Sequence, residues 1–259
     1  MLSINRFEGK KDVELALASF ALARADHSNL RLVIAGGYDP RLPDNVATLS
    51  SLQALADSLG LSHATFCASL PPSASPAISH TPPAELPSIV FLPNMTAPHK
   101  RALLTAASLR ALLYTPSFEH LGIVPLEAMS AGVAVLATAS GGPLETLVDH
   151  GLGESERDAH LTTGLVRAPN PQVWATAIKD LVALPAARRR TIGEAGRRRA
   201  RLLFSVETLA EELEGACRGA AEVGRPVWQE EGTMLAVGAA GMAAAMFAVG
   251  LVALVAQRS

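Results

Sequence analysis

Residues 111–138 read "ALLYTPSFEHLGIVPLEAMSAGVAVLAT" and predict a strand, a helix and a second strand. The apolar runs 111–116 and 133–138 are short and bounded by turn residues, as is typical of buried strands. Between them a helix is expected to begin near Ile123, with Pro125 in its first turn, and to end at the Ala-Gly pair 131–132. Apolar strands separated by helices favour a parallel sheet that is covered on both faces.

The same alternation runs through most of the chain. We therefore predict an α/β fold, a Rossmann-like doubly wound parallel sheet over residues 1–220, with its ligand beyond the carboxyl ends of the strands. Further strands are expected at 30–37, 64–68, 88–93 and 164–168, and helices at 46–60, 98–110, 171–184, 186–204 and 205–220, the last with Ser205 as its N-cap.

The overall composition excludes several kinds of protein. The 259 residues carry a formal net charge of −2, so the charge balance gives no indication of nucleic-acid binding. Cys67 and Cys217 lie far apart and outside any C-x-x-C motif, which argues against a disulfide framework or a zinc site.

The C-terminal stretch differs from the rest of the chain. Residues 233–256 contain no charged side chain, and a helix of this length reaches roughly 36 Å, enough to cross a hydrocarbon core of about 30 Å. We expect a transmembrane helix here, joined to the folded domain by a linker at 221–232. A buried core helix is the alternative. Arg218, Arg225 and Arg258 favour a cytosolic main body.

Two glutamates flank the start of the helix near Ile123. Glu119 lies in the preceding loop, and Glu127 projects from about the second turn. Free amides and the positive dipole end at a helix N-terminus suit a phosphate group, and carboxylates accept hydrogen bonds from sugar hydroxyls. By themselves, the two residues also fit a solvated loop position and an ordinary helix face.

Several segments together resemble one enzyme family. Residues 117–145 resemble the E-x7-E signature of retaining GT-B glycosyltransferases of family 4, and "NRFEGKKD" (5–12) resembles their R-x4-K segment. "INRFEGKKDVELAL", "VIAGGYDPRLPDNV" and "SGGPLETLVDH" are similar to segments of the eukaryotic alpha-1,3/1,6-mannosyltransferases of asparagine-linked glycosylation. The resemblance covers roughly residues 3–215 and corresponds to the C-terminal, donor-binding half of those enzymes.

This resemblance implies an activity and a location. Such enzymes transfer mannose from GDP-mannose to a dolichol-diphosphate-linked oligosaccharide during N-glycan precursor assembly. They act at the cytosolic face of the endoplasmic reticulum membrane, so the implied partners include the lipid bilayer and other glycosyltransferases of the same pathway. No D-x-D motif occurs in the chain, and we expect neither a cofactor nor a metal at the donor site.

The resemblance also implies a role for each matching residue. Arg6 and Lys11 would hold the diphosphate and stabilise its charge as it leaves, Glu119 would contact the mannose, and Glu127 would bind the ribose hydroxyls. Arg6, Lys11 and Glu119 are thus the candidate catalytic residues. Backbone contacts to the nucleotide sugar are expected from His120, Gly122, Ile123 and Val124, and close approach of a second loop at Gly141 and Gly142.

Other features leave alternatives open. Family members have two Rossmann-like domains, and the resemblance here begins in the second. The alternative function is therefore a truncated, membrane-tethered nucleotide-binding half without catalysis, acting as an interaction module. A related enzyme with another nucleotide sugar is a third option. The basic runs at 188–190 and 197–201 fit a solvated helix face, or contacts to the phosphates of lipid headgroups or of the acceptor.

Overall fold

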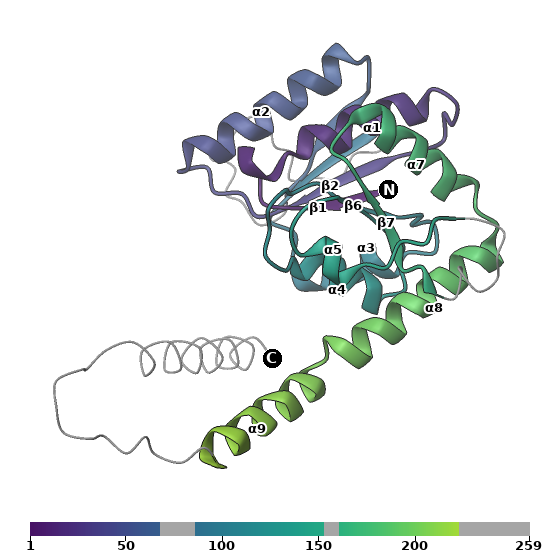
Figure 1. The fold of residues 1–259 in the computed structure, drawn as a ribbon. Helices are drawn as coiled ribbons and strands as arrows, with labels where there is room; N and C mark the ends of the chain where they lie inside the picture. The colour runs from purple at the N-terminus through teal and green to yellow at the C-terminus, as the bar shows by residue number, and fades with distance from the viewer. Residues whose placement is uncertain (68–85, 153–160, 223–259) are drawn as a thin grey trace. The chain divides into compact units, whose positions relative to one another are not determined.

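The structure is a computed structural model that describes residues 1–67, 86–152 and 161–222 (Figure 1). The predicted transmembrane segment 233–256 and nearly all of the linker before it lie outside these residues. Within the described part, no helix has the length and apolar character needed to cross a membrane. Contacts divide the chain into a unit Met1–Ala210 and a second unit Glu211–Ser259.

In the first unit, described residues form a seven-stranded parallel sheet with the order β3-β4-β2-β1-β5-β6-β7. The chain proceeds from the central β1 toward one edge and then returns to build the other edge from β5. This reversal confirms the doubly wound prediction and places the topological switch point, where such folds bind their ligands, at the carboxyl ends of β1 and β5. The strands are β1 (Leu2–Ile4), β2 (Leu32–Gly36), β3 (His63–Thr65), β4 (Ile89–Pro93), β5 (Leu112–Tyr114), β6 (Val135–Thr138) and β7 (Gly164–Arg167).

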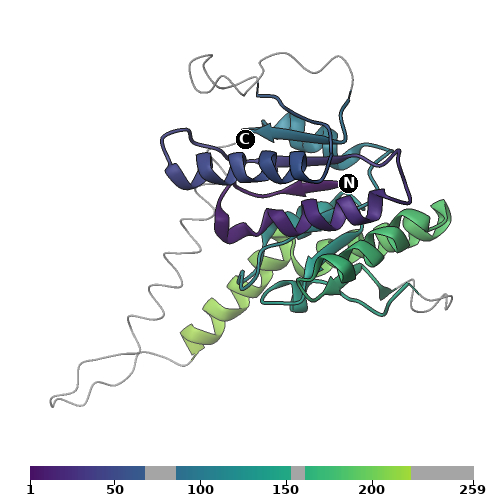
Figure 2. The same ribbon diagram turned by 90° about the horizontal axis from the view of Figure 1, so that it is seen from above.

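Helices cover both faces of the sheet, as predicted (Figures 1 and 2). Buried residues of α1, α2 and α7 pack on one face, and those of α3 and α4 on the other. The buried residues of α8 are divided, with Ile192 in the first cluster and Ala200 in the second. The helices of the described residues are the 3-10 turn η1 (Gly9–Lys11), α1 (Val13–Arg24), α2 (Pro43–Ser58), α3 (Ala97–Thr105), α4 (Ile123–Ser130), α5 (Pro143–Thr146), α7 (Pro171–Ala183), α8 (Ala186–Leu203) and α9 (Val206–Glu222).

Two helix predictions can be compared directly with the structure. Ser205 is confirmed as the cap of α9, because its Oγ accepts a hydrogen bond from the Thr208 amide at 3.1 Å. The prediction that one helix spans 98–110 is wrong at its end, since α3 stops at Thr105 and Ala106 is extended. A turn over 106–109 follows, which turns the chain into β5, and Ala and Leu residues do not signal such a break.

Candidate functional site

Polar loops meet at the carboxyl ends of the neighbouring strands β1, β5 and β6. The Thr115 hydroxyl, directly after β5, donates to the Lys11 carbonyl oxygen at 2.6 Å. The Thr138 hydroxyl at the end of β6 donates to the Thr115 carbonyl oxygen at 2.7 Å. Both threonines are fully buried, so these hydrogen bonds fix the loop after β1 relative to the two strands beside it.

At these carboxyl ends, Lys11 and Glu119 form an ion pair. Lys11 ends the 3-10 turn η1 in the loop after β1, and Glu119 lies in the loop after β5. Their side chains are 17% and 33% exposed. The structure thus brings together two of the residues that the sequence analysis selected as catalytic.

Arg6 has a different neighbour. Its guanidinium lies 3.5 Å from a Glu8 carboxylate oxygen, and its side chain is 74% exposed. Glu8 is also 3.2 Å from the Lys10 ammonium. Burial raises the pKa of the Glu8 carboxyl, but Lys10 and Arg6 outweigh this and leave that pKa below its usual value. Arg6 is therefore exposed near the site and does not take part in the Lys11–Glu119 ion pair.

Glu127 projects from the second turn of α4 and forms an ion pair with Lys100 of α3. The two side chains are 30% and 34% exposed. Sequence reasoning missed Lys100, although it lies in the first turn of a helix that follows β4 at the carboxyl edge. A lysine at that place in a doubly wound fold is the signal that would have identified it.

Gly141 and Gly142 allow the loop after β6 to pack against the loop that carries Glu119. The Gly142 amide donates to the Glu119 carbonyl oxygen at 2.7 Å. A Cβ at Gly141 would overlap the same carbonyl, and one at Gly142 would lie 2.5 Å from the His120 carbonyl oxygen. Gly141 also has φ +60°, which favours glycine. These glycines therefore position the backbone of Glu119.

Gly122 is the N-cap of α4 and has φ +75°, and a Cβ there would lie 2.7 Å from the Tyr114 hydroxyl oxygen. Tyr114 is 4% exposed, and burial together with the Glu119 charge raises its pKa to about 12. The neutral phenol therefore closes the base of the turn that leads into α4. Around this turn His120, Leu121 and Ile123 are exposed and Val124 is half-buried, so the predicted backbone contacts lie on an accessible surface.

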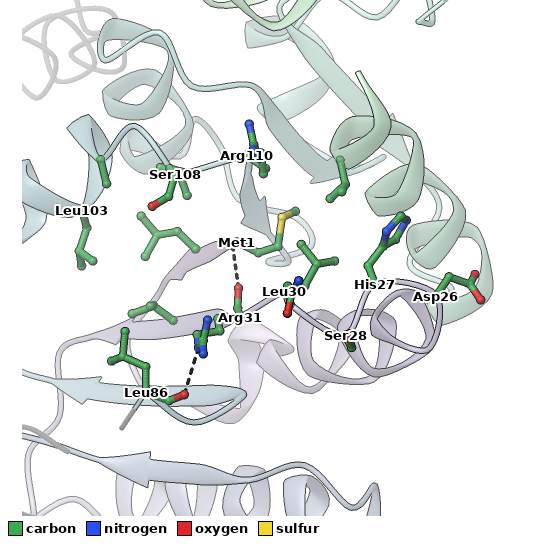
Figure 3. Close-up of a pocket in the computed structure, with 16 residues that line it drawn as sticks. Met1, Asp26, His27, Ser28, Leu30, Arg31, Leu86, Leu103, Ser108 and Arg110 are labelled. Carbon is green, nitrogen blue, oxygen red and sulfur yellow. Dashed lines mark hydrogen bonds between the residues drawn. The ribbon is translucent and has the colours of Figure 1, made fainter. Parts of the chain in front are cut away.

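Two further observations concern metals and cavities. The described residues hold no group of three or more His, Cys, Asp or Glu side chains placed for a metal ion. A cavity of about 680 Å³ lies at the opposite edge of the sheet, before β1, β2 and β5, where Arg31, Leu86 and Arg110 line it (Figure 3). This cavity is therefore separate from the loops that carry Lys11 and Glu119.

Comparison with known proteins identifies the relatives of this chain. Residues 85–199 match the family described as Glycosyl transferases group 1. The alpha-1,3/1,6-mannosyltransferase ALG2 of Saccharomyces cerevisiae is 46% identical over 180 residues, which cover 69% of this chain and 34% of the yeast protein. The protein of the same name from Rhizomucor pusillus is 37% identical over 250 residues, covering 93% of this chain and 50% of its own length.

Several solved structures have a similar fold. Sucrose-phosphate synthase from Thermosynechococcus elongatus has a TM-score of 0.60 at 22% identity, covering 86% of this chain and 46% of its own. Anabaena Alr3699/HepE in complex with UDP and glucose has a TM-score of 0.58 at 17% identity. The match covers 84% of this chain and 47% of that one. The C-terminal domain of a glycosyl transferase group 1 family protein (LpcC) from Francisella tularensis has a TM-score of 0.56 at 16% identity. The match covers 79% of this chain and 86% of that domain.

These coverages define the extent of the likeness. The chain spans between a third and a half of the length of the mannosyltransferases it matches. It spans most of the isolated C-terminal domain, but under half of the other two solved chains. The fold described here is therefore similar to that of the isolated C-terminal domain of the Francisella tularensis protein.

Proposed function

This chain is a homologue of the alpha-1,3/1,6-mannosyltransferases within the group 1 glycosyl transferases, and from that premise we propose that it binds GDP-mannose. It then serves transfer of the mannose, with retention, to a dolichol-diphosphate-linked oligosaccharide in N-glycan precursor assembly. The observation that carries the proposal is the Lys11–Glu119 pair at the switch point between β1 and β5. A cation and a carboxylate there can hold a diphosphate and a sugar side by side.

The diphosphate of the donor lies between Lys11 and the N-terminus of α4. Lys11 supplies a full positive charge, and the free amides at the start of α4 supply hydrogen bonds along a favourable dipole. The exposed Arg6 adds a second cation from the loop after β1. Together these groups take the role that a metal ion has at other nucleotide-sugar sites, and no metal or cofactor is part of the proposal.

The remaining contacts orient the two ends of the donor. Glu119 accepts hydrogen bonds from mannose hydroxyls, and its backbone is held in place by the Gly142 amide. Glu127 accepts hydrogen bonds from the ribose hydroxyls, which displaces Lys100 from at least one carboxylate oxygen. Both carboxylates already lie in ion pairs with a lysine. Donor binding therefore gives each carboxylate neutral sugar hydroxyls as hydrogen-bond donors, while Lys11 exchanges Glu119 for the diphosphate.

Transfer breaks the bond between mannose C1 and the β-phosphate oxygen and forms a bond from C1 to an acceptor hydroxyl oxygen. The hydroxyl proton moves to the departing phosphate oxygen, so atoms and charge balance. The attraction between Lys11 and the diphosphate is strongest as GDP leaves, because negative charge then builds up on the phosphate beside Lys11. Attack on the face from which GDP departs retains configuration, and Glu119 need not act as a nucleophile.

The proposed location is the endoplasmic reticulum membrane, with the described domain on the cytosolic side. The uncharged segment 233–256 supports contact with the bilayer, and the lipid-linked acceptor has to be reached from its surface. The alternative is an interaction module that binds nucleotide without catalysis. The shared name of the curated relatives supports the enzyme over this alternative.

Transfer of labelled mannose tests the proposal. The full chain in detergent is incubated with labelled GDP-mannose and a lipid-linked mannosyl-chitobiose acceptor, beside Glu119→Ala and the remote surface variant Glu194→Ala. We expect transfer by the wild-type chain and by Glu194→Ala, and its loss in Glu119→Ala. Binding of GDP without any transfer would favour the interaction module, and absence of both would reject the donor site altogether.

A further inference from the structure

A second pocket, of about 240 Å³, lies at the edge of the sheet opposite the proposed donor site. Its walls are the turn between α3 and β5, the turn between α4 and β6, and part of α8. Four arginines line it, and none of the lining residues carries a carboxylate. We call this cavity the arginine pocket. Its four arginines are Arg110, Arg189, Arg190 and Arg197.

Two of the four have hydrogen bonds that explain their position. Arg189 donates to the Leu184 carbonyl oxygen at the end of α7, and Arg197 donates to the Ala131 carbonyl oxygen at the end of α4, at 2.7 Å. Cations at helix C-termini are favourable. Helix capping therefore accounts for Arg189 and Arg197, but not for Arg110 and Arg190.

None of the four charges is neutralised by an ion pair in the described residues. The ion pairs of this part of the chain involve other arginines, among them Arg6, Arg41, Arg167 and Arg218. Burial, and then the positive charge of Arg110, lower the pKa of the Arg189 guanidinium. The arginine pocket thus holds like charges near one another, an arrangement that an anion would stabilise.

We propose that the arginine pocket binds a phosphate group. A guanidinium presents planar, paired donors that match phosphate oxygens, and several of them around one pocket suit a doubly charged ligand. The volume of about 240 Å³ lies below the roughly 300–1,000 Å³ of ordinary small-molecule pockets, so a phosphate group fits better than a nucleotide.

The neighbouring cavity favours a phosphate that belongs to a lipid. Arg110 lines both the arginine pocket and the cavity of about 680 Å³, and Ala106 and Leu109 do so too. Figure 3 shows Arg110 on one side of Met1 and Leu86 on the other. Apolar side chains line much of this cavity, including Leu30, Val33, Leu86, Leu103 and Val182.

The acidic residue that lines this cavity should repel a bound anion only weakly, because it already has a cationic partner. Asp26 is the acidic residue in its lining, and it lies 2.5 Å from the Lys179 ammonium. A phosphate bound by the arginines therefore has apolar walls next to it, with the nearby acid already paired. This arrangement matches the headgroup and first acyl carbons of an anionic lipid.

Ligand-dependent melting of the full chain in uncharged detergent tests the proposal. The probes are inorganic phosphate, dioctanoyl phosphatidic acid and the zwitterionic dioctanoyl phosphatidylcholine. Arg110→Gln and Arg190→Gln remove the two arginines that capping does not explain. Arg101→Gln and Arg201→Gln, on the exposed surfaces of α3 and α8, are matched controls for the loss of one charge. Lys11→Gln separates this site from the donor site, where phosphate also binds if the proposed function is right.

We expect phosphatidic acid to raise the melting temperature of the wild-type chain, the two controls and Lys11→Gln. Arg110→Gln and Arg190→Gln should each weaken the apparent affinity at least tenfold. If inorganic phosphate raises the melting temperature as much as phosphatidic acid does, the pocket binds phosphate, but its ligand is a free phosphate and not a lipid. The proposal is overturned if phosphatidylcholine acts equally, or if Lys11→Gln and not the pocket variants abolishes the response.

Melting without ligand gives an independent test. If the four charges repel one another in the empty pocket, Arg110→Gln should melt at the same temperature as Arg101→Gln or higher. A purely structural role for Arg110 would make its variant melt several degrees lower than the control. That result would overturn the proposal.

Discussion

Lys11 and Glu119 are 108 positions apart in the sequence and form an ion pair between the loops that follow β1 and β5. The Thr115 hydroxyl, which donates to the Lys11 carbonyl oxygen, holds the two loops together beneath the pair. In the absence of donor, Glu119 thus balances the cation proposed to hold the diphosphate. Under the proposed function, donor binding exchanges this carboxylate for phosphate.

The Lys11–Glu119 pair should contribute modestly to stability. Because both side chains are partly exposed, we expect a coupling free energy of about 0.5–1 kcal/mol. Denaturant unfolding of Lys11→Met, Glu119→Gln and the double variant measures this coupling. The same cycle at the exposed pair Glu214–Arg218 of α9 is the control, with about 0.3–0.5 kcal/mol expected. Strictly additive effects of the Lys11 and Glu119 substitutions would contradict the pairing.

Glu127 and Lys100 should affect GDP binding unequally. Glu127→Ala removes the proposed ribose acceptor and should weaken GDP binding by about 1.5–3 kcal/mol, the range for a hydrogen bond to a charged group. Lys100→Ala removes only the partner that GDP displaces, so its effect should stay below about 1 kcal/mol. Calorimetric titration with GDP measures both. Equal losses in the two variants would assign Lys100, not Glu127 alone, to the nucleotide.

Gly141→Ala should impair the site more than a glycine substitution elsewhere. Gly60 and Gly141 have φ +65° and φ +60°, but the space around Gly60 is open, whereas a Cβ at Gly141 would overlap the Glu119 carbonyl oxygen. Gly60→Ala should therefore cost about 1–2 kcal/mol of unfolding free energy from its backbone conformation. Gly141→Ala should cost about 1–3 kcal/mol more.

The same two variants separate stability from binding. Because the Glu119 loop must shift to accept the extra carbon, GDP affinity should fall in Gly141→Ala and stay unchanged in Gly60→Ala. Urea denaturation and GDP calorimetry on both proteins provide the comparison. Indistinguishable losses of stability would mean that the left-handed conformation, and not the contact between loops, explains Gly141.

Tyr114 should make the folded domain sensitive to alkaline pH. Its pKa is raised to about 12, above the ordinary value of 10, by burial and by Glu119. A raised folded pKa means that the stabilisation is complete below about pH 10 and is lost as pH rises through about 12. The shift corresponds to about 2–3 kcal/mol. Unfolding of the wild type and of Tyr114→Phe between pH 9 and 12 should show the smaller decline in the variant.

A decline of equal slope in both proteins would remove Tyr114 as the cause. A reducing agent prevents cysteine oxidation at high pH from affecting the comparison, because the chain contains Cys67 and Cys217. The pH dependence measured below pH 9 should be the same in the two proteins, because Tyr114 is neutral there in both folded and unfolded chains.

Much of the fold was predictable because its signals are local. The stretch 111–138 alternates between apolar runs and a capped helix, and β5, α4 and β6 lie where it predicts them. The first strand was not predicted, although β1 is buried and pairs with both β2 and β5. Three residues are too few to show a periodicity, so the central strand of the sheet has almost no local signal.

Hydrophobic periodicity, a property of short segments, predicted the doubly wound class. The choice of Arg6, Lys11, Glu119 and Glu127 as candidate site residues came from the resemblance of short motifs to a glycosyltransferase family. Which charged side chains pair with one another depends on the folded arrangement of the loops. Glu119 pairs with Lys11, Glu127 with Lys100, and Arg6 with Glu8. Such pairs form between loops brought together by sheet order, and the free energy of each depends on distance and burial that no linear pattern contains.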